Sequence, residues 1–313
     1  MKRRIILGTR GSDLALTQAR LAEAAMRAKW PELEIEMEII RTSGDEAREP
    51  GAAPEVSIGT AGRKGLFTAE IERALIAGTV DAAVHSAKDL PSALGSRTEI
   101  GAVLPRGSVE DVLVSLGNYD LESLPYGGTV ATGSVRRQHQ LRWKRPDLQI
   151  AELRGNVPTR LRKLTAQKWD GIVLARAGLE RLGIRPNENQ IDFETNRLFF
   201  TVLPADVFVP AGGQGVIALQ IRVEDDQSRD FVRPINHQDT RVCLRVEREF
   251  LRLLEADCNQ PVGVYAIGKG NEITVLAQIF DSGSNAPREA KAEGKPEDAE
   301  QLAANLLHRI NGG

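Results

Sequence analysis

Cysteine is scarce in this sequence, with only Cys243 and Cys258 among 313 residues. The two do not form a Cys-x-x-Cys pair, and the four histidines do not cluster at metal-ligand spacing. A disulfide framework and a structural zinc site are therefore not indicated, and we expect no metal in the functional site. Such cysteine usage is typical of a protein of the reducing cytosol.

Aromatic residues are also few, at 4% of the chain, and the formal net charge is only -2. Nucleic-acid binders usually carry a positive field, and those that bind single strands stack bases on aromatic rings. Long apolar runs are missing too, since the longest uncharged stretch, residues 207–221, contains Pro210 and three glycines. Only three apolar residues follow the basic opening before Gly8, too few for a signal peptide. We therefore expect a cytoplasmic protein that binds neither nucleic acid nor membrane.

What the sequence does contain is a repeated alternation of short apolar runs, turns and helical patterns. The first example is residues 3–30, where Ile5, Ile6 and Leu7 precede a turn and an amphipathic stretch. The same order recurs at residues 82–89, 129–144, 150–158 and 171–179. Alternating strands and helices predict α/β units with parallel sheets, and the chain is long enough for two or three domains.

From Thr240 onward the pattern changes to a helix reaching about Leu253, two strands near residues 262–267 and 273–280, and a last helix over about 296–310. This tail predicts a small α+β unit. Segments rich in glycine and proline at residues 104–108 and 209–215 are candidate hinges between domains. We therefore predict three domains, with the boundaries 1–105 plus 214–235, 106–213, and 236–313.

Positive charge is concentrated between residues 130 and 181, where twelve lysines and arginines stand against four acidic residues. Such a local excess implies an anionic partner. Solvated helix faces explain many of these side chains, but Arg136, Arg137 and Arg154 follow predicted strand ends, where open α/β sheets bind ligands. Arg10 and Ser12 repeat this placement after the first strand. Because guanidinium groups beside helix N-termini suit carboxylates and phosphates, the residues alone predict a cleft that binds a polyanion.

Several single residues that could take part in catalysis also have structural explanations. Asp89 follows a strand end, where an aspartate is more often a cap than a catalyst. His85 fits a core histidine. Cys243 falls on the apolar face of its helix, whereas Cys258 lies in a loop where its thiol would be accessible. Residues 59–65 lack the spacing and the Ser or Thr of a Walker phosphate loop.

A set of short motifs, in order along the whole chain, resembles the signature of the porphobilinogen deaminase (hydroxymethylbilane synthase) family. One is VHSAKDLP at residues 84–91. The others are RGS at 10–12, KGLF at 64–67, SVRRQ at 134–138, LRGNV at 153–157 with TR at 159–160, AGLERL at 177–182 and GQG at 213–215. The combination is highly specific.

The resemblance implies a transferase of tetrapyrrole (haem-type) biosynthesis that joins four porphobilinogen molecules, releases ammonia and delivers hydroxymethylbilane. It implies a covalent dipyrromethane cofactor on a loop cysteine, here Cys258 within residues 254–263. The family's catalytic aspartate corresponds to Asp89. Cofactor-binding positions correspond to Cys258, Lys88, Ser134, Arg136, Arg137, Arg154 and Gly155, and substrate-binding positions to Arg10, Ser12, Lys64, Arg160 and Arg181. We expect a monomer.

Two doubly wound α/β lobes joined by two crossings, plus a small C-terminal α+β domain, also resemble type II periplasmic binding proteins. A solute-binding protein is therefore the rival interpretation. Such a protein would need an export signal, and it would have no use for Cys258.

Residues 42–64 form a long segment that is rich in helix breakers and ends at Lys64, and we hypothesise that this segment is a mobile lid. Departures from the family pattern occur at Thr60, Gly133, Ala256 and Asp257.

Overall fold

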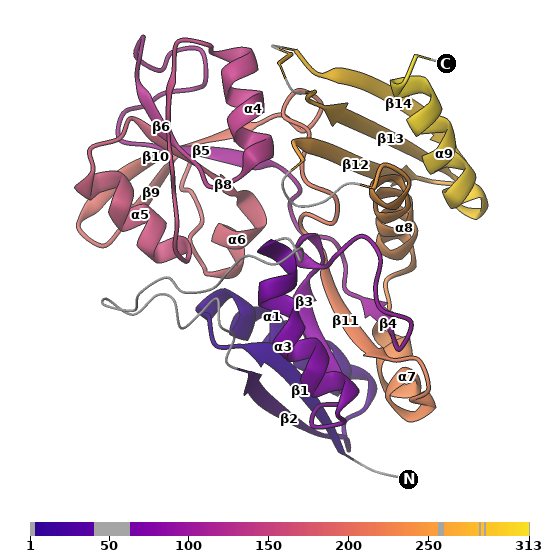
Figure 1. The fold of residues 1–313 in the computed structure, drawn as a ribbon. Coiled ribbons are helices and arrows are strands. Elements are labelled where there is room, and N and C mark those ends of the chain that lie inside the picture. Colours follow the sequence, from indigo (N-terminus) through magenta and orange to yellow (C-terminus); the bar gives the residue numbers. More distant parts are fainter. Residues whose placement is uncertain (1–3, 41–62, 256–259, 282, 285, 313) are drawn as a thin grey trace.

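The computed structural model describes residues 4–40, 63–255, 260–281, 283–284 and 286–312, and the side chains of residues 63–67 are not described. Figure 1 shows three bodies, which we call the first lobe (bottom), the second lobe (upper left) and the C-terminal domain (upper right). Their sheets have five, six and three strands. The predicted fold of two α/β lobes with a small C-terminal α+β domain is therefore confirmed. The hypothesised lid lies, up to residue 62, outside the described residues.

The first lobe is built around a sheet of order β2-β1-β3-β11-β4. Its first helix begins where Ser12 Oγ accepts a hydrogen bond from the Ala15 amide, and it buries Ala19, Ala22 and Met26 against the sheet. The strands are β1 (Arg4–Arg10), β2 (Glu34–Ile40), β3 (Ala82–Ser86), β4 (Thr98–Val103) and β11 (Ile217–Arg222). The helices are α1 (Asp13–Lys29), α3 (Arg63–Ile76) and α7 (Asp226–Val232), with the short 3-10 helices η1 (Ala87–Asp89) and η2 (Arg233–Ile235).

The second lobe has a sheet of order β7-β6-β8-β5-β10-β9. Two of its helices begin at side-chain caps, because Ser134 and Asn156 accept hydrogen bonds from backbone amides, and Pro158 stands in the first turn of the second of these helices. Its strands are β5 (Asp111–Ser115), β6 (Thr129–Ala131), β7 (Gln149–Ala151), β8 (Gly171–Ala175), β9 (Gln190–Phe193) and β10 (Asn196–Leu203). Its helices are α4 (Val135–Lys144), α5 (Val157–Ala166) and α6 (Arg176–Arg181).

The C-terminal domain packs two helices on an antiparallel sheet of order β12-β13-β14. Val246, Phe250, Val264, Val275 and Leu306 form much of its core. The elements are α8 (Gln238–Leu253), β12 (Val262–Lys269), β13 (Glu272–Ile279), β14 (Arg288–Gly294), the 3-10 helix η3 (Pro296–Asp298) and α9 (Ala299–Ile310). Among the described helices of the chain, none has the length and apolar character needed to cross a bilayer.

The prediction of parallel sheets is correct only in part, because both lobes have mixed sheets. In the first lobe β1 is parallel to β2 and β3, but β11 is antiparallel to β3 and β4. In the second lobe β5 is antiparallel to its neighbours β8 and β10. The reason is the double crossing: β11 enters the first sheet from the second lobe, at the edge where β3 and β4 end, so it must run against them.

The two crossings run side by side between the lobes. The Leu104 amide donates to the Ile217 carbonyl at 3.1 Å, and the Gly107 amide donates to the Gly215 carbonyl at 3.0 Å. Gly215 has φ +82°, and a Cβ there would lie 2.6 Å from the Gly107 carbonyl oxygen. The strands of each sheet fall within the predicted domain ranges, while the hinge role of these segments and the exact boundaries stay predictions.

Candidate active site

A cavity of about 220 Å³ lies between the two lobes. Its walls come from the ends of β1 and β3, from α1, α4, α5 and α6, and from the second crossing. We call it the interlobe cavity. Eight of the predicted site residues line it: Arg10, Ser12, Lys88, Asp89, Arg137, Gly155, Arg160 and Arg181.

The first lobe contributes its residues from the ends of two neighbouring strands. Because β1 and β3 are parallel and adjacent, their carboxyl ends meet at one edge of the sheet. Arg10 ends β1, and Lys88 and Asp89 follow β3 in η1. Gln18 Nε2 donates to Ser86 Oγ at 2.7 Å, which ties α1 to the end of β3. The local order of strand, turn and helix thus delivers these side chains to one wall.

The second lobe contributes three arginines, two of which donate to backbone carbonyls at the cavity wall. Arg160 Nε donates to the Gly155 carbonyl oxygen at 2.7 Å. Arg181 Nη2 donates to the Gly215 carbonyl oxygen at 2.6 Å, and burial lowers the pKa of Arg181. Arg137 projects from the first turn of α4. Three helices therefore direct positive charge into the cavity from the side opposite Asp89.

Asp89 is half-buried at the end of η1 and lines the interlobe cavity. Within the part of the chain that the structure describes, no hydrogen bond or ion pair engages its carboxylate, so it does not serve as a cap. Both oxygens are available to accept hydrogen bonds from a ligand. His85, four residues earlier, is buried, and burial lowers its pKa to about 4, so its ring is neutral near pH 7.

Lys88 has an unusual protonation equilibrium. Burial, and next the positive charge of Arg137, lower the pKa of Lys88 to about 8, although Asp89 and Asp111 act in the opposite direction. Its Nζ donates to Gln214 Oε1 at 3.3 Å. An anionic ligand in the cavity would raise this pKa again, so Lys88 is suited to a site that receives carboxylates.

Arg136 and Arg137 share a buried carboxylate, that of Asp111 at the start of β5. Arg136 Nη2 and Arg137 Nη2 lie 2.7 and 2.6 Å from the two Asp111 oxygens, and Gln214 Nε2 donates to one of them at 2.9 Å. Burial alone would raise the pKa of Asp111, but the two arginines hold it well below its usual range. Arg136 also donates to the Val209 carbonyl oxygen and does not line the cavity, whereas Arg137 does.

The remaining predicted site residues lie elsewhere or outside the description. Ser134 caps α4 and accepts from a backbone amide. Arg154 is exposed and donates to Glu152 Oε1 at 2.7 Å. Lys64 stands in the first turn of α3, where side chains are not described, and Cys258 lies outside the described residues. The ligand-binding roles of all four stay predictions.

Gly133, a departure from the family pattern, has a structural explanation. A Cβ at this position would lie 2.5 Å from the Leu153 carbonyl oxygen. The backbones after β6 and β7 therefore approach so closely that any side chain would force them apart.

Sequence reasoning missed two residues that organise the cavity wall, Asp111 and Gln214. Gln214 contacts Lys88, Asp111 and the Val109 carbonyl oxygen, so it connects the second crossing to both lobes. Its place in the GQG motif was a signal that it is more than a turn residue. Asp111 could have been suspected because it is the one acidic residue of its strand and stands directly before three apolar residues, Val112 to Val114.

Comparisons with known proteins give a consistent result. The family model described as "Porphobilinogen deaminase, dipyromethane cofactor binding domain" matches residues 5–230, and the one described as "Porphobilinogen deaminase, C-terminal domain" matches residues 241–311. The porphobilinogen deaminase of Syntrophobacter fumaroxidans is 41% identical over 302 residues, covering 96% of this chain and 92% of that protein. That of Nitrobacter winogradskyi is 42% identical over 309 residues, covering 97% and 92%.

Solved structures with a similar course of the chain are more distant. The methionine binding protein MetQ is 14% identical with a TM-score of 0.44, covering 75% of this chain and 90% of that one. The VFT2 domain of Bordetella pertussis BvgS, in a double mutant, is 14% identical with a TM-score of 0.44, covering 74% and 86%. The two family models, in contrast, span both lobes and the C-terminal domain. The chain belongs to the porphobilinogen deaminase family.

Proposed function

We propose that this chain is a hydroxymethylbilane synthase, the transferase of tetrapyrrole biosynthesis that joins four porphobilinogen molecules head to tail with release of ammonia. Family membership over nearly the whole chain supports this activity. We locate the reaction in the interlobe cavity because of the side chains that line it. Among the described residues that line it, one carboxylate, Asp89, stands with five cationic side chains.

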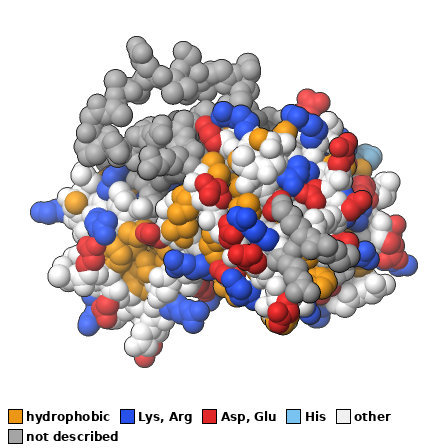
Figure 2. Space-filling model, turned by 90° about the horizontal axis from the view of Figure 1, so that it is seen from below, with side chains coloured by type: hydrophobic (Ala, Val, Ile, Leu, Met, Phe, Trp, Pro, Cys, Tyr) orange, Lys and Arg blue, Asp and Glu red, His pale blue; other side chains and the backbone are white. Residues whose placement is uncertain are grey.

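The cationic side chains fit the chemistry of the substrate. Each porphobilinogen ring carries one acetate and one propionate arm, so every condensation adds two carboxylates to the bound chain. Arginine and lysine side chains with fixed partners, such as Arg160 and Arg181, can hold such carboxylates in a defined orientation. On the face shown in Figure 2, basic and acidic side chains are intermingled, so positive charge does not dominate that surface.

The same residues fit the dipyrromethane cofactor that the matched domain model names. When bound, this group supplies the pyrrole terminus to which the substrate is joined. Lys88 and Arg137 would hold its carboxylates, since both line the same cavity as Asp89. Its covalent attachment to Cys258 is part of the proposal.

Asp89 is the residue to which we assign the chemical step. When the C–N bond of the aminomethyl group breaks, ammonia leaves and a positive charge develops on the pyrrole and its methylene carbon. The new C–C bond then forms, and the attacked α-carbon loses its proton, which balances the proton taken up by the leaving nitrogen. A carboxylate fixed in the cavity stabilises the developing cation and accepts a pyrrole N–H hydrogen bond. The half-buried position of Asp89 strengthens this interaction relative to water.

The test is the turnover of Asp89→Asn, which keeps size but removes the charge. We expect product formation and ammonia release to fall on the order of 10²-fold, with unchanged folding. Asp226→Asn is the matched control, since Asp226 is exposed and pairs only with the nearby Arg229 among described residues. If Asp89→Asn keeps more than about a tenth of the rate, a penalty below about 1.4 kcal/mol, Asp89 is not the catalytic group.

We also propose that the enzyme acts as a cytoplasmic monomer. The small excess of negative charge and the absence, among the described helices, of a candidate membrane span are compatible with this. Sedimentation at micromolar concentration should give a single species with the mass of one chain. A dimer that persists on dilution would contradict the monomer.

A further inference from the structure

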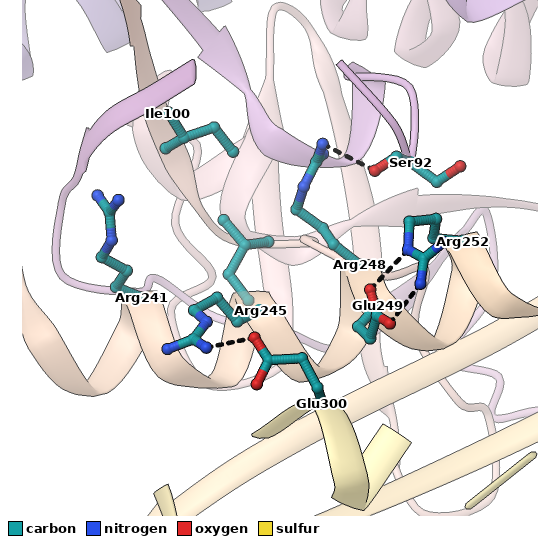
Figure 3. A pocket seen from close by; sticks show the side chains of 9 residues that line it. Ser92, Ile100, Arg241, Arg245, Arg248, Glu249, Arg252 and Glu300 are labelled. Carbon is teal, nitrogen blue, oxygen red and sulfur yellow. Dashed lines mark hydrogen bonds and ion pairs between the residues drawn. The ribbon is translucent and has the colours of Figure 1, made fainter. Parts of the chain in front are cut away.

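A second cavity, of about 220 Å³, lies between the first lobe and the C-terminal domain (Figure 3). Four arginines of α8 line it, together with Ser92 and Ile100 of the first lobe, and we call it the arginine groove; the arginines are Arg241, Arg245, Arg248 and Arg252. It shares no lining residue with the interlobe cavity. None of its residues has a role in the proposed reaction.

The four arginines lie on one face of α8 because they are spaced by four, three and four residues. The opposite face buries Val242, Val246 and Phe250 in the core of the C-terminal domain. Like charges three or four residues apart destabilise a helix, so this face needs compensating negative charge.

Among the described residues, only two of the four form ion pairs with carboxylates. Arg245 pairs with Glu300, and Arg252 pairs with Glu249 at 2.7 Å (Figure 3). Both of these arginines are exposed at the rim of the groove.

The other two, Arg241 and Arg248, are half-buried, and within the described part of the chain they donate only to backbone carbonyls. Arg241 Nη1 lies 3.0 Å from the Gly101 oxygen, and Arg248 Nη2 lies 3.0 Å from the Ser92 oxygen. Glu99 is close enough to act on Arg241, but its carboxylate is bonded to Arg229 at 2.9 Å. Burial lowers the pKa of Arg248 to about 10, which still leaves it protonated at neutral pH.

We propose that the arginine groove binds a compact oxyanion with at least two negative charges, held between Arg241 and Arg248. Guanidinium groups bind carboxylate and phosphate oxygens in paired geometry, so phosphates and polycarboxylates share the chemistry required. A water molecule occupies about 30 Å³ in the liquid, so the groove has room for such an anion and part of its hydration shell. The bound anion would connect the first lobe to α8, whose end lies shortly before the predicted cofactor loop.

Calorimetric titration of the full-length, cofactor-loaded protein with inorganic pyrophosphate and, separately, with citrate tests the proposal at low ionic strength. We expect one equivalent to bind, and Arg241→Gln/Arg248→Gln to weaken binding at least tenfold. The control Arg162→Gln/Arg197→Gln removes the same charge from two exposed arginines of the second lobe and should leave binding unchanged. Stronger binding of pyrophosphate would identify a phosphoryl ligand, and stronger binding of citrate a carboxylate ligand.

The variant Arg160→Gln separates this groove from the interlobe cavity, and it should bind the probe like the wild type. The proposal is overturned if neither probe binds, if Arg160→Gln abolishes binding, or if the Arg241/Arg248 variant titrates like the wild type. Should that variant fail to fold, Arg241→Lys/Arg248→Lys keeps the charge but loses the planar forks. It should bind the probe several-fold more weakly, and equal affinity would contradict the proposed contacts.

Discussion

Removal of the Asp111 charge should destabilise the second lobe strongly. The Asp111 carboxylate is fully buried and takes hydrogen bonds from Arg136, Arg137 and Gln214 at 2.6 to 2.9 Å. In Asp111→Asn two buried guanidinium groups would face a neutral amide that can satisfy only one of them well. Breaking a buried ion pair in this way costs about 3–5 kcal/mol.

Urea unfolding followed by tryptophan fluorescence measures this effect, because Trp143 and Trp169 both belong to the second lobe. With an m value of about 3 kcal/mol/M, the unfolding midpoint should fall by about 1 M or more. Asp192→Asn is the matched control: Asp192 and its partner Arg197 are exposed, and such pairs contribute little, so its midpoint should hardly change.

The pH dependence of stability tests the role of the Asp111 carboxylate independently. In the folded protein the pKa of Asp111 lies below its usual range. The contribution of Asp111 to the free energy of unfolding is therefore complete above about pH 4, the pKa of an aspartate in the unfolded chain, and is lost as the pH falls further. The wild type should therefore lose stability below pH 4 more steeply than Asp111→Asn. A loss under about 1 kcal/mol for Asp111→Asn at pH 7 would contradict this prediction, because it would mean that other groups compensate the charge of the two guanidinium groups.

Three further predictions concern the interlobe cavity. The value of kcat/KM should fall above about pH 8 as Lys88 loses its proton in the free enzyme, and Lys88→Arg should move that fall to higher pH in a pH–rate profile. Arg160→Gln should raise KM about tenfold while the exposed Lys168→Gln does not, and equal steady-state kinetics for the two would remove Arg160 from the binding site. Gly213→Ala should lower the free energy of unfolding in urea by about 1–3 kcal/mol, because Gly213 has φ +76° and a Cβ there would lie 2.9 Å from the Lys88 amide nitrogen. An unchanged unfolding midpoint would show that the second crossing can relax around the new side chain.

Local sequence order was enough to place one wall of the cavity. Arg10 and Asp89 were located by strand-turn-helix patterns, and these act through neighbouring parallel strands whose ends must meet. Helix α4 (Val135–Lys144) likewise falls in the strand-turn-helix pattern predicted for residues 129–144, and Ser134 caps it. Family motifs then added Arg160 and Arg181, whose position in the cavity depends on how the two lobes face each other.

The parts that the sequence did not predict depend on contacts between distant segments. Nothing near Arg136 in the sequence indicates that it pairs with Asp111, which lies 25 residues away on strand β5. Strand β11 was missed as the antiparallel partner of β3, since its direction is set by the return from the second lobe. Strand β14 was missed because Arg288–Gly294 is mostly polar and buries only one residue, Ala292.

The most direct test of the account is the mass of the active protein and of its cysteine peptides after denaturation. Covalent attachment of the cofactor to Cys258 predicts an intact mass above that of the sequence by two pyrrole units, with the addition on the peptide that contains Cys258. Cys243 should be unmodified, since it is buried in the C-terminal core and burial raises the pKa of its thiol to about 11. An unmodified mass from active enzyme, or an addition on Cys243, would contradict the account.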